Sequence, residues 1–113
     1  MVKVASCSIE NLLNQLSGTW TTYILWFLYK DRAVRFGELR RKVGGISTKV
    51  LTERLRMLES MEIVDRHYAP TIPPQVTYSL TDRGKELAKA LTPLYKLAHR
   101  WQESALLGEE LEC

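Results

Sequence analysis

The chain has 113 residues, of which 45% are hydrophobic, and it includes three tryptophans and five tyrosines. This length and composition predict one globular domain with a moderate core and exclude a disordered chain. The formal net charge of +3 is too small to identify a partner. No apolar run approaches the ~20 residues that a membrane span needs, and the first residues lack a signal-peptide pattern, so we expect a cytoplasmic protein with no membrane partner.

The first thirty residues predict two helices. The first should run over 9–16 with Ser8 as its cap. One of its faces carries Ile9, Leu12, Leu13 and Leu16. After a break at Ser17-Gly18, the second helix should run over 19–30. Because this helix is apolar on almost every side, we expect it at the centre of the fold, followed by a connection over 31–34.

Residues 36–61 carry the most informative pattern. A helix over 36–43 has apolar residues at 36, 39 and 43, and the pair Gly44-Gly45 stops it. Ser47 is a suitable N-cap for a second helix over 48–61, whose apolar residues recur with a 3.6-residue period. Two short helices joined by a glycine turn are typical of a helix-turn-helix, whose second helix enters a DNA major groove.

The following segment predicts a β-hairpin and a long helix. Residues 62–69 and 75–80 fit two strands, and the prolines within 70–74 make that stretch the tip between them. A helix should begin near Asp82, and Pro93 should cause a kink or a capped restart in it. Its apolar residues have coiled-coil-like spacing: Leu87, Leu91, Leu94, Ala98, Trp101 and Ala105.

Several motifs occur in the order and spacing of one protein family. They are Leu16-Ser17-Gly18-Thr19-Trp20, Arg35-Phe36-Gly37-Glu38-Leu39, Gly45-Ile46-Ser47-Thr48-Lys49, Pro73-Pro74-Gln75-Val76-Thr77-Tyr78 and Leu80-Thr81-Asp82-Arg83-Gly84. With these motifs the chain resembles the HxlR-type winged helix-turn-helix regulators from Cys7 to about Trp101. It departs from them at Cys7-Ser8, where the family usually has Cys-Pro, and at Gly18-Thr19-Trp20, where it has Gly-Lys-Trp.

The resemblance implies a prokaryotic transcription regulator that acts as a homodimer. The fold class would be α+β and mostly α, with one winged helix-turn-helix domain over 1–113. Residues 1–18 and 81–107 would form the N- and C-terminal helices of the dimer, 36–61 the helix-turn-helix and 62–80 the wing. A two-fold dimer implies a pseudo-palindromic operator in double-stranded DNA.

Candidate DNA-binding residues follow from the outer face of the helix over 48–61 and from the wing. Lysine and arginine pair with guanine or phosphate, and threonine meets base edges. Glu53 could accept from cytosine or pair with Lys49. Wing residues would contact the DNA backbone or the minor groove. The full set is Arg35, Ser47, Thr48, Lys49, Thr52, Glu53, Arg56, Arg66, His67, Thr71 and Gln75.

The distribution of charge favours a nucleic-acid partner. Residues 30–67 hold ten Lys/Arg against six Asp/Glu, whereas 103–113 hold four acids and no base. The alternative is a winged-helix protein-interaction module without DNA binding, which should expose aromatic or aliphatic side chains over 48–60. We expect no enzyme, because the sequence has no catalytic, phosphate-loop or metal-ligand pattern, and no cofactor is implied.

Cys7 and Cys113 lie at opposite ends of the chain and predict neither a disulfide framework nor a metal site. Cys7 precedes a helix start, where a thiol becomes more reactive. Several members of the resembled family sense oxidants or electrophiles through a cysteine in the equivalent position. Two interpretations of Cys7 stay open: a redox-sensing thiol, or a packing residue without that role. The sequence predicts no particular inducer.

Overall fold

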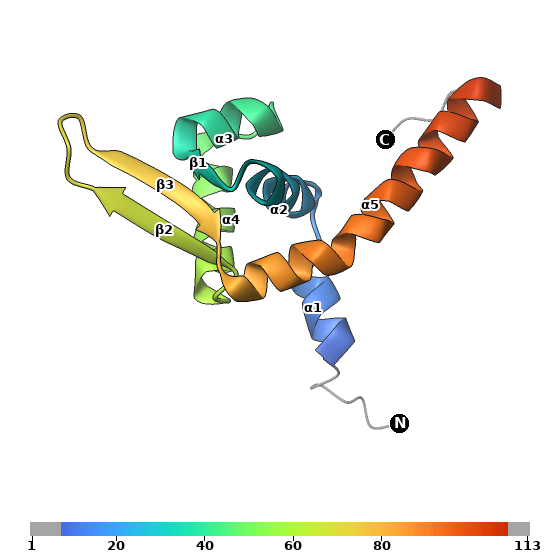
Figure 1. The fold of residues 1–113 in the computed structure, drawn as a ribbon, viewed down its shortest axis with the longest axis horizontal. Helices are drawn as coiled ribbons and strands as arrows, with labels where there is room; N and C mark the ends of the chain where they lie inside the picture. The colour runs from blue at the N-terminus through green and yellow to red at the C-terminus, as the bar shows by residue number, and fades with distance from the viewer. Residues whose placement is uncertain (1–7, 109–113) are drawn as a thin grey trace.

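The computed structural model describes residues 8–108, without the side chains of residues 19 and 105–108. In chain order the elements are α1 (Ser8–Leu16), α2 (Thr19–Asp31), β1 (Ala33–Arg35), α3 (Phe36–Val43), α4 (Thr48–Ser60), β2 (Val64–Ala69), β3 (Gln75–Leu80) and α5 (Asp82–Gly108). Ser8, the predicted cap, is the first residue of α1. The fold is mostly helical, with a small sheet at one side of the helices, as predicted (Figure 1).

Helix α2 lies at the centre of the molecule, as its apolar sequence predicts (Figure 1). Its residues Ile24, Leu25 and Leu28 are buried, and the helix packs against α3, α4, α5 and β3. Tyr23 and Tyr29 stay partly exposed, so α2 is covered on most sides but not on all. The apolar residues of α3, α4 and the sheet complete one continuous core around it.

The sheet is antiparallel with strand order β1-β3-β2, one strand more than the predicted hairpin. The prediction that 31–34 form a connection is wrong for Ala33 and Val34, which belong to β1. Val34 pairs with Tyr78 of β3 and is buried. Three residues are too few to show a strand period in the sequence, so β1 depends on its pairing with a distant neighbour.

The chain turns sharply between α4 and β2, and β2 begins at Val64 instead of Glu62 as predicted. Glu62 has a left-handed backbone with φ 61°. Its N–H bonds back to α4, and the N–H of Ile63 bonds to the carbonyl of Leu58 at 3.0 Å. This pair of hydrogen bonds is a Schellman motif, which ends α4. Glu62 and Ile63, which were predicted to be the first residues of the strand, belong to this motif instead.

Strands β2 and β3 form the wing, which extends away from the helices (Figure 1). They pair from Val64 opposite Leu80 to Ala69 opposite Gln75. Residues 70–74 form the tip, as the prolines predict. There the hydroxyl of Thr71 donates to a backbone carbonyl at 2.7 Å, which stiffens the tip.

Helix α5 begins at a tightly held junction. The hydroxyl of Thr81 donates to the carbonyl of Glu62 at 2.6 Å and accepts from the N–H of Gly84 at 2.9 Å. The N–H of Thr81 donates to the carbonyl of Ile63 at 3.0 Å. Gly84 is buried against that same carbonyl. The start of α5 is therefore tied to the turn that follows α4.

Helix α5 continues through Pro93 without the capped restart that we considered, and its axis bends partway (Figure 1). Before the proline, the Thr92 hydroxyl donates to the carbonyl of Ala88 at 2.9 Å, a type of bond that bends helices. Beyond it, the Tyr95 hydroxyl donates to the backbone carbonyl of residue 22 at 3.1 Å. Burial raises the pKa of Tyr95, so the phenol stays protonated and able to donate.

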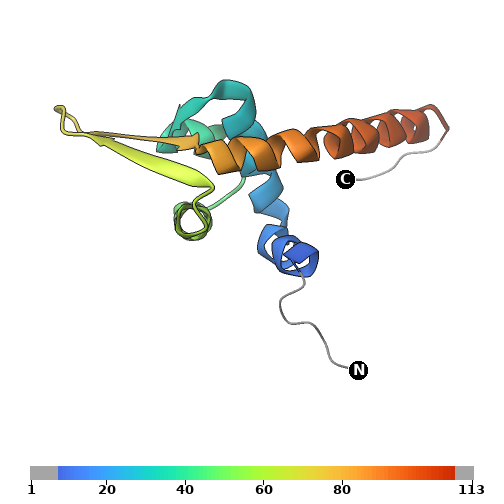
Figure 2. The same ribbon diagram turned by 60° about the horizontal axis from the view of Figure 1, so that its bottom comes forward.

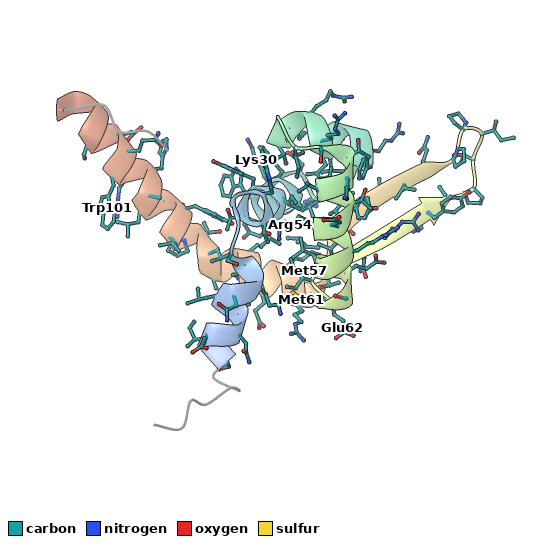
Figure 3. All side chains as sticks on the ribbon, turned by 180° about the vertical axis from the view of Figure 1, so that it is seen from behind. Lys30, Arg54, Met57, Met61, Glu62 and Trp101 are labelled. Atoms are coloured by element: carbon teal, nitrogen blue, oxygen red, sulfur yellow. The ribbon has the colours of Figure 1, made fainter. Side chains whose placement is uncertain are left out.

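Apolar side chains at both ends of the described chain lie outside the core. Helix α1 and the distal half of α5 project from it (Figures 1 and 2). The predicted apolar seam of α5 divides. Leu87 and Leu91 pack against the core, while Leu94 is 59% exposed. Trp101, on the distal half of the helix (Figure 3), is 66% exposed. On α1, Ile9 and Leu13 are 60% and 59% exposed. Among residues 8–108, no helix is both long and apolar enough to cross a membrane.

Candidate nucleic-acid interface

The turn between α3 and α4 has the geometry that its sequence predicts. Gly44 and Gly45 have φ values of 71° and 79°, which glycine adopts without strain. The hydroxyl oxygen of Ser47 accepts a hydrogen bond from the N–H of Val50 at 3.1 Å and so caps α4. These local interactions fix where α4 begins and which side chains lie in its first turn.

Helix α4 has one buried and one exposed face. The buried face carries Leu51, Leu55 and Leu58, and the exposed face carries Lys49, Glu53, Arg56 and Ser60. Thr52 lies beside the exposed face, and its hydroxyl donates to the carbonyl of Thr48 at 2.8 Å. No ion pair joins Lys49 to Glu53 within the described residues, so both charged groups are available to a ligand.

A groove of ≈ 430 Å³ lies between α4 and the wing. It brings together four of the predicted DNA-binding residues: Thr48, Thr52, Arg56 and Arg66. Glu59 and three apolar or aromatic side chains line the rest of it, and among them the rings of Phe36 and Tyr78 lie 6.4 Å apart. Two exposed guanidinium groups from different elements thus flank a groove of mixed polarity next to the exposed face of α4.

Other predicted residues lie outside this groove. Successive side chains of a strand point to opposite faces, so His67 and Gln75 lie on the sheet face opposite Arg66. Arg35 is in register with Thr77, which is in register with His67. Arg35, Thr77 and His67 therefore lie on one face of the sheet, the far face, which is opposite the face that carries Arg66. Ser47 caps α4, the exposed Lys49 and Glu53 lie on that helix outside the groove, and Thr71 lies at the wing tip.

Tyr68 on the wing is absent from the predicted set. It is 50% exposed, and the Arg66 guanidinium carbon lies 6.0 Å from its ring centroid. The two residues are two positions apart in β2 and so share one face. That spacing in the strand is the signal by which the sequence could have identified Tyr68 as a neighbour of Arg66.

Three basic residues of the helix-turn-helix contact the protein itself. The Nε of Arg40 donates to the carbonyl of Ile46 at 3.2 Å, which holds the turn. The Nζ of Lys42 lies 2.9 Å from Oδ2 of Asp31. The guanidinium of Arg54 lies against Gly18 between α1 and α2, on a different side of α4 from the exposed face (Figure 3). These cations stabilise the motif.

No group of three His, Cys, Asp or Glu side chains within residues 8–108 could hold a metal ion. The exposed side chains beside the groove are instead lysine, arginine, threonine and glutamate. These groups donate and accept hydrogen bonds and carry charge, which suits the binding of a polyanion with exposed base edges.

Known proteins share this sequence and this arrangement. An uncharacterised HTH-type transcriptional regulator of Synechocystis is 40% identical over 107 residues, which cover 95% of this chain and 76% of the relative. A structure described as a MarR-family transcriptional regulator from Porphyromonas gingivalis superimposes with a TM-score of 0.78 at 28% identity, covering 88% of this chain and 96% of the other. The redox regulator HypR in its oxidised form gives a TM-score of 0.70 at 35% identity, covering 87% and 96%.

These likenesses extend over the helix-turn-helix, the wing and most of α5. The family profile described as HxlR-like helix-turn-helix matches residues 15–105, which include every described element except most of α1 and the end of α5. The chain therefore belongs to the HxlR-like helix-turn-helix family and is a transcriptional regulator of the helix-turn-helix type.

Proposed function

We propose that the protein binds double-stranded DNA in a sequence-specific manner as a homodimer. The observation that carries this proposal is the groove between α4 and the wing, in which Arg56 and Arg66 lie next to the exposed polar face of α4. A capped helix with such a face fits the major groove, and the adjacent wing can follow the DNA backbone.

The residues of α4 would contact different parts of the DNA, depending on their position in the helix. Thr48 and Lys49 lie in the first turn, where base edges are usually contacted, and Thr52 lies one turn later. Arg56 and Arg66 flank the groove from two elements and suit phosphate contacts. The proposed contacts of Arg35, His67, Thr71 and Gln75 would require the DNA to reach the far face of the sheet or the wing tip.

The alternative is a protein-interaction module without DNA binding. Such a module should present aromatic or aliphatic side chains on the outer face of α4. That face carries Lys49, Glu53, Arg56 and Ser60, all of them exposed. The composition therefore supports DNA as the partner, and a selection of bound fragments from random DNA tests this directly. Enrichment of a pseudo-palindrome with half-sites about one helical turn, or a multiple of it, apart is expected.

Arg56→Ala should weaken binding to operator and random DNA by similar factors. Arg56 lies two turns after the N-terminus of α4 and is exposed beside the wing, so we assign it to a phosphate. Loss of one phosphate contact should lower the slope of log affinity against log salt by about one. Binding isotherms at several salt concentrations measure this slope. A loss confined to the operator would instead assign Arg56 to a base.

The dimer should form through the apolar ends of the chain. Ile9, Leu13, Leu94 and Trp101 are all more than half exposed in the single subunit. Burying such surface between two subunits removes it from water, at about 25 cal/mol per Å². Helices α1 and α5 of two subunits would then pack across a two-fold axis, as the family resemblance implies.

Leu94→Glu should convert a dimer into a monomer. The wild type should sediment with twice the mass of the 13.0 kDa chain at micromolar concentration, because Leu94 would be buried between subunits. A charge there would be desolvated without a partner. Lys96→Glu changes an exposed residue of the same helix and should leave the mass unchanged. A monomeric wild type would contradict the proposal.

A response to oxidants through Cys7 is the remaining part of the proposed function. Cys7 lies outside the described residues, so the sequence position and the likeness to the redox regulator HypR support this part. Oxidation would have to favour a form with a different DNA affinity, since a reactive thiol alone changes nothing.

Cys7→Ser should abolish any effect of oxidant on operator binding. Wild type and Cys7→Ser are compared by DNA binding with and without peroxide, and again after reductant. The wild type should change affinity reversibly, because sulfenic acid and disulfide forms are reduced by thiols. An equal response of both proteins, or none in the wild type, would assign Cys7 to packing.

A further inference from the structure

A second cavity, of ≈ 650 Å³, lies where the end of α2, β1, the end of β3 and the start of α5 meet. Its volume is within the range of small-molecule sites, about 300–1,000 Å³. None of its lining residues comes from α4, and it shares no residue with the groove beside the wing. It is therefore a separate site from the proposed DNA interface.

This cavity gathers positive charge without a neutralising partner. Lys30, Arg32 and Lys85 line it, and no acidic residue does. Within residues 8–108 none of the three forms an ion pair. The hydroxyls of Tyr29 and Ser79 add possible donors, and Leu80 supplies an apolar wall. Like charges from separate elements repel one another, and an anion bound between them would offset that repulsion.

The backbone of Arg32 supports a role in binding. Arg32 follows α2 with φ 71° and ψ −72°, a conformation that side-chain-bearing residues rarely adopt. Glycine would adopt it more readily and is the usual residue just after a helix. The chain instead has a guanidinium here, and that side chain lines the cavity. Backbone strain of this kind clusters at functional sites, which supports a role of Arg32 at this cavity.

We propose that this cavity binds a small organic dianion, either a phosphate monoester or a dicarboxylate. A guanidinium pairs with two oxygens of such a group, and the two lysines add point charges from other elements. The wall at Leu80 suits a small apolar body on the ligand. This site is independent of DNA binding, and its test requires no DNA.

Calorimetric titration of the full chain with phenyl phosphate and with phthalate, at constant ionic strength, tests the proposal. At least one of these dianions should bind saturably, and neutral benzyl alcohol should not. Lys30→Gln and Lys85→Gln should each weaken binding about tenfold or more. Lys89→Gln removes an exposed charge from α5 outside the cavity and should bind as the wild type does.

The Arg32→Gly variant distinguishes a loss of ligand binding from a loss of stability. This variant should raise the thermal midpoint of the ligand-free protein, because the strain at Arg32 is relieved, and should lose the dianion. Absence of saturable binding by both dianions, or equal weakening in Lys89→Gln, would overturn the proposal. So would Lys30→Gln and Lys85→Gln variants that bind the dianions normally but show a smaller salt slope with DNA, since that would make the cluster a phosphate contact for DNA.

Discussion

Gly84→Ala is expected to destabilise the folded protein by about 3 kcal/mol, the upper part of the usual range for overpacking a core. A Cβ at this position would overlap the carbonyl oxygen of Ile63 and lie 3.2 Å from its Cγ2. That carbonyl cannot easily move, because the N–H of Thr81 donates to it at 3.0 Å. Urea unfolding at one fixed protein concentration measures the loss as a lower midpoint.

Gly37→Ala is the matched control for this substitution. Gly37 lies in α3, is exposed, and a Cβ there would meet nothing within 4 Å. Since alanine favours a helix over glycine, this variant should gain about 0.5–1 kcal/mol. If the two substitutions change the free energy of unfolding in opposite directions, the loss in Gly84→Ala comes from the packing of α5 on the turn after α4. If Gly84→Ala were neutral, α5 would not approach Ile63 as closely as the structure has it.

The helix-turn-helix could be predicted closely because its signals are local. Paired glycines, the Ser47 cap and the spacing of Leu51, Leu55 and Leu58 each act within a few residues of the chain. The boundaries of α3 agree with the prediction at both ends, and α4 differs only at its last residue. Capping and helical periodicity depend on nearby residues and therefore appear directly in the sequence.

The features that could not be predicted depend on contacts between distant residues. Strand β1 exists because Val34 pairs with Tyr78, which lies more than forty positions away. The groove exists because α4, which carries Arg56, lies beside the wing strand β2, which carries Arg66. The cavity with Lys30, Arg32 and Lys85 joins segments that lie more than fifty positions apart in the chain. Hydrophobic periodicity gives the face of an element but not its neighbour.

The contacts of the Arg54 side chain could not be predicted from the sequence either. Its charge alone would make it a candidate for DNA, since it lies within the basic segment. In the structure its guanidinium packs against Gly18 at the junction of α1 and α2, away from the exposed face of α4 (Figure 3). A helical wheel separates buried from exposed faces, but it does not show which long polar side chain covers a neighbouring element.

Lys49→Ala should reduce affinity for the operator by about 1–3 kcal/mol, roughly 5- to 150-fold, and relax the preference at one base position. Lys49 is exposed in the first turn of α4 and makes no ion pair within the described residues. Its ammonium is therefore available to guanine O6 and N7, and its removal should leave folding unchanged. Titration of the operator, and of operator variants at each base pair, measures both effects.

Lys89→Ala is the control, because it removes the same charge from an exposed position on α5 that lies away from the groove. It should lower affinity only slightly, through the long-range field, and leave the base preferences intact. The contrast with Arg56→Ala is equally informative, since a phosphate contact weakens all sequences alike, whereas a base contact weakens the operator most. If Lys49→Ala retained both the affinity and the base preferences of the wild type, α4 would not read the major groove with its first turn, and the DNA would have to be recognised through another surface.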